Sequence, residues 1–470
     1  MKNGTVTILM LFPALLFLFI PGALFSGEQR IGGTLLKVEC DRAGNCQYSA
    51  GEEMRFTISA VEAKTGNPLP GSRVRCVVHQ DGRPSETWEK TLPEGRETLL
   101  LKAPEENPGW TLLTVSLLNE KGKKTGADVL CGALVEKDRI RTATPDPEDF
   151  DSFWKAQIDT MRKKVAGEKP DAGVERTPME VPEKYRETVR AWRVRLSCGG
   201  GGAPGNSPEG GGEQNFASGI LTMPMKAEEK SLPAIVQFHG ASTVGVAQGQ
   251  YYYGEKAIAL TLSPHPVESG MTQEYYRKFR KEHLEGYPRR NADNRDKYYM
   301  KDMVLRAVRA LDYVKTLPEW NGSVLVLHGE SQGGFQSIAA AALVPEVTLC
   351  VCMVPAMSDH LAYEKKRLPG WPGLIRLTKE GTPQTDEANL KISQNAPYFD
   401  SVNFAKRVRC PIYLSTGLLD TTCPPTGILA LHANLPDSTE RHLYIAADKG
   451  HAAGHPEGGA ILEKILREGK

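Results

Sequence analysis

Residues 324–336 read VLVLHGESQGGFQ, an apolar run that meets a short glycine-rich turn and continues into an alanine-rich segment. The apolar run is typical of a strand that is buried on both faces, and the residues after Ser331 are typical of a helix. Gly-Glu-Ser-Gln-Gly fits the pattern G-x-S-x-G, which presents a serine at a sharp strand-to-helix turn. We therefore interpret Ser331 as a nucleophile; the alternative is a turn that only connects two elements.

Similar apolar strands alternate with helices on both sides of this stretch, between about residue 145 and residue 470. Such alternation predicts an α/β fold, with a mostly parallel sheet covered by helices on both faces. The predicted strands are 188–198, 217–224, 232–240, 257–263, 323–329, 347–355, 410–420 and 441–447, the first two antiparallel. The predicted helices are 298–317, 331–344, 426–435 and 458–468. Between the first two strands, the glycine-rich residues 199–215 are predicted to form a flexible loop and not a phosphate-binding loop.

The chain in front of this region has a different pattern. Residues 30–140 contain short β-branched runs separated by Gly, Pro and Asn turns, which predicts a small all-β, immunoglobulin-like sandwich. Helical periodicity begins in residues 145–165, so we place the domain boundary near Asp146 and assign residues 145–470 to the second domain.

The first 27 residues are predicted to be a signal peptide. Met1 and Lys2 are followed by a long apolar run with no charge until Glu28, and small residues that permit cleavage precede that glutamate. The alternative is a retained membrane anchor, which Pro13 and Pro21 disfavour. We therefore expect a secreted or periplasmic protein, with no stable membrane span after processing.

Charge and cysteine content narrow the partners and the compartment. With 58 basic and 57 acidic side chains, the net charge is +1, so nothing indicates a nucleic-acid partner. Export makes disulfides stable among the nine cysteines. Two pairings are open from the sequence: Cys40 with Cys46, and Cys76 with Cys131. No cysteine or histidine spacing predicts a metal site, and no cofactor is implied.

A nucleophilic serine needs a base, and the base needs an orienting acid. In proteins with the G-x-S-x-G turn these residues follow in the order Ser, Asp or Glu, His. Asp420 ends the predicted strand 410–420 and is our candidate acid; its alternative role is a helix cap. Two histidines follow the last strand, and we favour His451 as the base over His455.

An oxyanion hole requires two backbone N–H donors. One is expected from Gln332, the residue after the nucleophile, and the second from Ala241 in the loop after strand 232–240. His239 in that loop is expected to support it through hydrogen bonds. Aromatic residues Trp371 and 251–253 are candidates for the substrate pocket, with core packing as the alternative.

Taken together, these segments resemble carbohydrate esterase family 7, the acetyl xylan esterase and cephalosporin C deacetylase group of α/β hydrolases. The resemblance covers about residues 145–470 and lies in PEDFDSFWKAQ, IVQFHGA, the helix, strand and turn of 296–334, and GLLDTTCPP. It implies Ser331 as nucleophile, Asp420 as acid, His451 as base, and an oxyanion hole from Ala241 and Gln332. The sandwich in front resembles the variant found in secreted, polysaccharide-degrading bacteria.

Three positions depart from the pattern of the family. Its Arg-Gly-Gln segment is replaced within residues 260–270, its His-Glu pair is not matched at His451, and Ala241 stands where many members have tyrosine. The resemblance thus implies the same reaction with a different pocket wall. Members often form ring-like oligomers, so a homo-oligomer is also compatible with the resemblance.

The sequence therefore predicts a secreted serine esterase that removes acetyl groups from carbohydrate esters such as acetyl xylan. One alternative is a prolyl-oligopeptidase-like peptidase, although about 110 residues without repeats are too few for its propeller domain. The other alternative is a non-catalytic carbohydrate-binding protein on a hydrolase scaffold.

Overall fold

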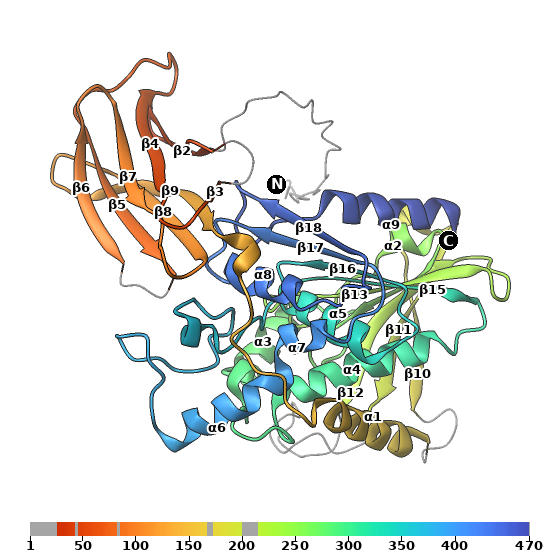
Figure 1. Cartoon of the computed structure of the whole chain (residues 1–470). Helices are drawn as coiled ribbons and strands as arrows, with labels where there is room; N and C mark the ends of the chain where they lie inside the picture. Colours follow the sequence, from red (N-terminus) through yellow and green to blue (C-terminus); the bar gives the residue numbers. More distant parts are fainter. Residues whose placement is uncertain (1–25, 43–45, 82–84, 167–172, 200–214, 470) are drawn as a thin grey trace.

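The computed structural model describes residues 26–42, 46–81, 85–166, 173–199 and 215–469 (Figure 1). Most of the predicted signal peptide and most of the glycine-rich segment 199–215 lie outside these residues. Two sheets at the N-terminal end are followed by a larger sheet with helices on both of its faces. This arrangement confirms the prediction of an α/β fold preceded by an all-β region.

The all-β region consists of a four-stranded sheet, ordered β1-β2-β4-β7, and a five-stranded sheet, ordered β3-β9-β8-β5-β6. Alternate residues of β4, such as Met54, Phe56 and Ile58, are fully buried, as expected for a strand with one face on a core. The strands are β1 (Ser26–Ile31), β2 (Thr34–Cys40), β3 (Gln47–Tyr48), β4 (Glu53–Glu62), β5 (Ser72–Gln80), β6 (Glu86–Leu92), β7 (Arg96–Lys102), β8 (Gly109–Leu118) and β9 (Lys124–Val135).

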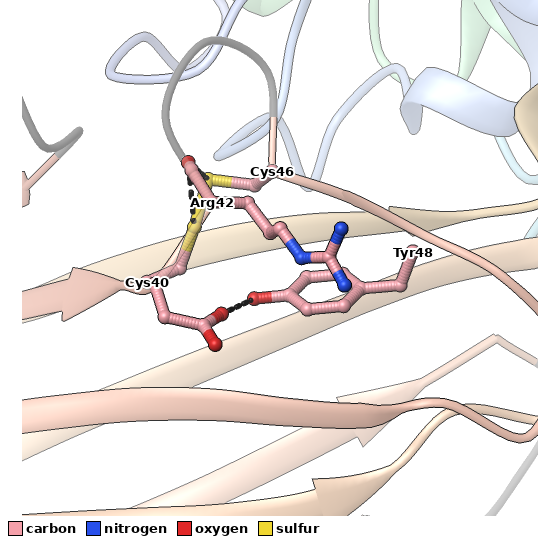
Figure 2. Close-up of a disulfide and its surroundings, with 5 residues drawn as sticks. Cys40, Arg42, Cys46 and Tyr48 are labelled. Carbon is pink, nitrogen blue, oxygen red and sulfur yellow. Dashed lines mark hydrogen bonds between the residues drawn. A yellow bond between two sulfur atoms is a disulfide. The ribbon is translucent and has the colours of Figure 1, made fainter. Parts of the chain in front are cut away.

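Of the two disulfides left open by the sequence, the structure contains the one between Cys40 and Cys46, whose Cα atoms are 6.5 Å apart (Figure 2). Cys76 and Cys131 are free and buried, so the second pairing is wrong. These cysteines lie on β5 and β9, which are separated by β8 in the same sheet. Strands two apart are about 10 Å from each other, which exceeds the Cα separation that a disulfide spans.

The larger sheet has nine strands in the order β10-β11-β12-β14-β13-β15-β16-β17-β18. The neighbouring pairs from β10 to β14 are antiparallel. The neighbouring pairs from β14 through β13 and β15 to β18 are parallel. The strands are β10 (Val174–Met179), β11 (Val189–Ser197), β12 (Phe216–Pro224), β13 (Leu232–Phe238), β14 (Ile258–Leu262), β15 (Trp320–Glu330), β16 (Leu349–Met353), β17 (Ile412–Gly417) and β18 (Arg441–Ala446).

Helices on both faces explain why the central strands are continuously apolar. In β15, Leu325 and Leu327 pack into the core on the side of α4 and α5, whereas Val326 packs with Leu462 of α9 on the other side (Figure 1). Because both faces of the sheet are covered, the middle of such a strand is buried whichever way its side chains point, as residues 325–327 of β15 are. The helices are α1 (Phe150–Ala166), α2 (Tyr251–Gly254), α3 (Gln273–His283), α4 (Tyr299–Val314), α5 (Gln332–Leu343), α6 (Glu387–Asn395), α7 (Ser401–Ala405), α8 (Pro425–Ala433) and α9 (Pro456–Glu468).

The segment between β9 and α1 is fastened to the larger sheet region by two buried carboxylates, Asp359 and Asp400, the second of which accepts a hydrogen bond from the Thr144 hydroxyl at 2.8 Å. Asp359 accepts hydrogen bonds from the backbone N–H groups of Ala143 and Thr144, at 2.8 and 3.0 Å, and pairs with buried Arg367 at 2.8 Å. The all-β region is thereby held beside the end of the sheet that carries β17 (Figure 1). Within the described ranges, no helix is both long and apolar enough to cross a membrane.

Candidate active site

Ser331 lies at the turn between β15 and α5, with a φ of 58° that is unusual for a residue other than glycine. The flanking glycines are required by close backbone contacts. A Cβ atom on Gly329 would lie 2.3 Å from the carbonyl oxygen of Gly333, and one on Gly333 would lie 2.5 Å from that of Phe238. The tight turn presents the serine side chain at the carboxyl edge of the sheet, as the sequence pattern predicts.

The side chains of Ser331, His451 and Asp420 form a continuous hydrogen-bonded row. His451 Nε2 is 2.8 Å from Ser331 Oγ, and His451 Nδ1 is 2.8 Å from Asp420 Oδ2. The other carboxylate oxygen of Asp420 accepts hydrogen bonds from the backbone N–H groups of Thr422 and Cys423, at 2.8 and 2.9 Å. Asp420 is buried, and every contact holds its carboxylate toward the histidine ring.

The structure also separates the alternatives that the sequence left open. His455 is the N-cap of α9, and its Nδ1 accepts a hydrogen bond from the Gly458 N–H at 3.1 Å, so it lies outside the row. Asp420 does not cap α8, whose N-cap residue is Pro424. The contact with Ser331, for which the sequence offered both His451 and His455, is therefore made by His451.

The charges around His451 favour its protonated form. Burial lowers the pKa of the ring, but the hydrogen bond with Asp420 and the negative charges of Asp420 and Glu330 outweigh burial and raise the pKa above its ordinary value. Glu330 precedes the serine and lines the same cavity. A base of this kind accepts a proton readily from a hydroxyl group at 2.8 Å.

The Glu330→Gln variant is expected to shift the acid limb of the pH profile of kcat/KM toward lower pH. A protonated His451 cannot act as a base, so activity falls as the pH drops through the pKa of the histidine, which the Glu330 charge raises. Removing that charge lowers the pKa and extends activity to lower pH. Glu463→Gln on the exposed face of α9 is the control; equal profiles for all three proteins would contradict the assignment.

A cavity of about 400 Å³ opens at Ser331. It is lined by residues 237–243, residues 328–331, Met353, Trp371, Thr422 and His451. Trp371 is therefore a pocket residue, as the sequence suggested. Residues 251–253 do not line the cavity. Tyr251 is buried with Val189 and Tyr253 packs partly buried beside α9, which is the core role left open for them, whereas Tyr252 is 46% exposed.

The loop after β13 brings Ala241 to the serine. A Cβ atom on Gly240 would lie 3.6 Å from the Cβ of Ser331, so the loop runs close beside the serine, and Ala241 lines the same cavity. We expected His239 to support this loop through hydrogen bonds, but its buried Nε2 has no hydrogen-bond partner among the described residues. Burial also lowers the pKa of His239 to about 4. Arg280 of α3 instead donates hydrogen bonds to the carbonyl oxygens of Ala241 and Ser242.

Two further residues contact the predicted site residues and were not found from the sequence. The hydroxyl of Tyr287, which is buried in a short 3-10 helix (Tyr287–Arg289), donates to the side-chain oxygen of Gln332 at 2.6 Å. Cys423 is buried, which raises the pKa of its thiol well above the ordinary value although a hydrogen bond with the Ser331 side chain lowers it. Tyr287 belongs to no motif, and Cys423 lies in the segment GLLDTTCPP without a predicted role, so only their spatial positions show these contacts.

Across the part of the chain that the structure describes, no group of three or more His, Cys, Asp or Glu side chains is arranged to hold a metal ion. The polar groups at Ser331 are a hydroxyl, an imidazole, two carboxylates and backbone N–H groups. This set can activate a serine hydroxyl and stabilise a developing negative charge.

Known proteins resemble this chain in sequence and in fold. Residues 133–457 match the acetyl xylan esterase (AXE1) family. The chain is 32% identical over 295 residues to acetyl esterase Axe7A of Xylanibacter ruminicola, an alignment that covers 61% of this chain and 60% of the relative.

Two solved structures share the fold. Acetyl xylan esterase 1 from Thermoanaerobacterium sp. JW/SL YS485 has a TM-score of 0.54 and 20% identity, and covers 71% of this chain and 97% of its own. Acetyl xylan esterase from Paenibacillus sp. R4 has a TM-score of 0.53 and 19% identity, and covers 70% and 97%. The family match spans more than half of the chain and confirms the resemblance seen in the sequence: the protein belongs to the acetyl xylan esterase family.

Proposed function

We propose that the protein is a serine esterase that removes acetyl groups from carbohydrate esters. The observation that carries this proposal is the row of Ser331, His451 and Asp420, with two hydrogen bonds of 2.8 Å, at the mouth of one cavity. Family membership and the acetyl esterase from Xylanibacter ruminicola support an acetyl ester as the substrate.

In the first half of the reaction, Ser331 Oγ attacks the ester carbonyl carbon while its proton passes to His451 Nε2. The electron pair of the C=O bond moves to the oxygen, and the N–H groups of Ala241 and Gln332 bind the resulting oxyanion. As the carbonyl re-forms, the bond to the sugar oxygen breaks and that oxygen takes the proton from His451. An acetyl-serine and a free sugar hydroxyl remain.

In the second half, His451 takes a proton from water, and the water oxygen attacks the acetyl carbon. The bond to Ser331 Oγ breaks, the serine regains its proton from the histidine, and acetate leaves. Asp420 orients Nδ1 and stabilises the imidazolium ion that forms twice in the cycle. No step needs a metal ion or an organic cofactor.

Release of acetate from acetylated xylo-oligosaccharides tests the substrate class. We expect acetate from these oligosaccharides and from p-nitrophenyl acetate, and no cleavage of short proline-containing peptides, with the Ser331→Ala variant as the blank. Cleavage of the peptides without release of acetate would favour the peptidase alternative. Binding of the oligosaccharides without any turnover would instead favour the non-catalytic one.

We also propose that the enzyme is exported, with residues 1–27 removed as a signal peptide. The apolar leader supports this proposal, and so does the Cys40–Cys46 disulfide, since such bonds persist in oxidising compartments. N-terminal sequencing of the protein recovered from the periplasm or the medium tests the proposal; an intact Met1 on a cytoplasmic protein would contradict it.

A further inference from the structure

The all-β region contacts the chain that carries the catalytic acid. Trp110 of β8 is only 1% exposed, and its indole N–H donates a hydrogen bond to the carbonyl oxygen of Leu418 at 2.8 Å. Leu418 follows β17 directly and precedes Asp420 by two residues. A buried hydrogen bond thus joins the first region to the start of the acid loop, residues 418–424.

A second contact is made by the neighbouring strand. A Cβ atom on Gly132 of β9 would lie 2.2 Å from the carbonyl oxygen of Leu418 and 2.8 Å from its Cβ. The backbone of β9 therefore touches Leu418 with no room for a side chain between them. Since both partners are backbone or Cβ atoms, a rotamer change cannot relieve this packing.

On its other side, the start of the acid loop is held by the chain that carries the base. The N–H of Leu418 donates to the carbonyl oxygen of Ala446, and the N–H of Leu419 donates to that of Lys449, each at 3.0 Å. Lys449 is two residues before His451. Residues 418 and 419 are thus held between the all-β region on one side and the segment that leads to His451 on the other.

Asp81 holds the Trp110 backbone in the all-β region beside the larger region. Its carboxylate accepts a hydrogen bond from the backbone N–H of Trp110 at 2.9 Å and another from the N–H of Leu368 at 3.1 Å. Leu368 lies in the larger region, three residues before the pocket residue Trp371, whose N–H donates to the Thr422 carbonyl oxygen at 2.9 Å. The contact at Leu418 is consequently linked to the far end of the acid loop through Asp81 and the chain from Leu368 to Trp371.

We propose that Trp110 and Gly132 are positioning residues for the reaction, and that the all-β region sets the position of Asp420 relative to His451. This inference rests on the esterase function proposed above. A shift of Leu418 moves the acid loop against the histidine segment and lengthens the 2.8 Å contact between Asp420 Oδ2 and His451 Nδ1. The imidazolium ion then loses part of its stabilisation in the transition state.

The Trp110→Phe variant tests the hydrogen bond because phenylalanine keeps an aromatic ring and loses the donor. We expect kcat on p-nitrophenyl acetate to fall about 10-fold, within the roughly 100-fold that a 1 Å misplacement costs, with KM nearly unchanged. We also expect the acid limb of the kcat/KM profile to move to lower pH, because Asp420 raises the pKa of His451. Trp88→Phe on β6 is the matched control.

The Gly132→Ala variant tests the packing by pushing on Leu418 without removing the hydrogen-bond donor. Gly33→Ala is the matched control, because a Cβ atom at Gly33 meets nothing within 4 Å. We expect a fall in kcat and the same pH shift for Gly132→Ala, and wild-type kinetics for Gly33→Ala. Titration with a serine-reactive organophosphate gives the concentration of intact sites, so that a loss of folded protein is not counted as a loss of kcat.

Two outcomes would overturn the inference. The first is wild-type kcat and pH profile per intact site in Trp110→Phe, which remains decisive if Gly132→Ala fails to fold. The second is a lower number of intact sites with an unchanged pH profile, which is the result expected if Trp110 and Gly132 only stabilise the fold. Failure of the esterase proposal is recognised separately, by equal rates for the wild-type protein and Ser331→Ala.

Discussion

The Ser331→Ala variant is expected to lose about a million-fold in kcat on p-nitrophenyl acetate, leaving only the catalysis that the oxyanion donors and substrate binding supply. The reason is that the Ser331 hydroxyl is the nucleophile aligned with His451, at 2.8 Å from Nε2. Alanine removes that single oxygen and fits the turn no worse than serine. Initial rates of p-nitrophenol release, measured over a wide range of enzyme concentration, check the expectation.

Ser337 offers a control serine six residues further along the chain. Its hydroxyl donates to the carbonyl oxygen of Gly333 within α5, at 2.9 Å, and it is buried like Ser331. Ser337→Ala is expected to keep kcat within a few-fold of the wild-type value. If Ser331→Ala retained more than about a hundredth of wild-type kcat with a native circular dichroism spectrum, another residue would have to be the nucleophile.

The Asp420→Asn variant is expected to reduce kcat by about 10,000-fold, the second-largest effect of the set. Asparagine keeps the size of the side chain and still offers an oxygen to the N–H groups of Thr422 and Cys423. Its amide N–H₂ faces Nδ1 of His451, however, and a donor there favours the tautomer that carries a proton on Nε2. That tautomer cannot accept the proton of Ser331, so the measurement is kcat at a pH above the histidine pKa.

Asp448→Asn is the matched control, because Asp448 lies three residues before His451 and pairs at the surface with Lys449, at 3.1 Å. Surface pairs of this kind contribute little, so near wild-type kcat is expected. Loss of less than tenfold in Asp420→Asn would show that the carboxylate does not set the tautomer of the histidine. A comparable loss in both variants would indicate general damage to the loop.

Local patterns in the sequence were sufficient to predict the core of the fold. The predicted strands 217–224 and 441–447 match β12 and β18 to within one residue, and the turn at Ser331 lies between β15 and α5 as expected. The missed elements are strands β1, β2, β3, β6 and β10 and helices α2, α3, α6 and α7. Strand β6 is mostly exposed, and α3 buries only Tyr276 and Phe279 among many charged residues, so neither has the high apolar content of the elements that were predicted.

The order of elements, the serine turn and the candidate acid were determined by the sequence alone, because each depends on neighbours within a few residues along the chain. Only the tertiary structure decided that His451 and not His455 contacts Ser331, that Cys76 and Cys131 stay apart, and that Trp110 reaches Leu418. These outcomes depend on distances between residues tens to hundreds of positions apart. Such distances are set by how sheets and loops pack together, which no local pattern encodes.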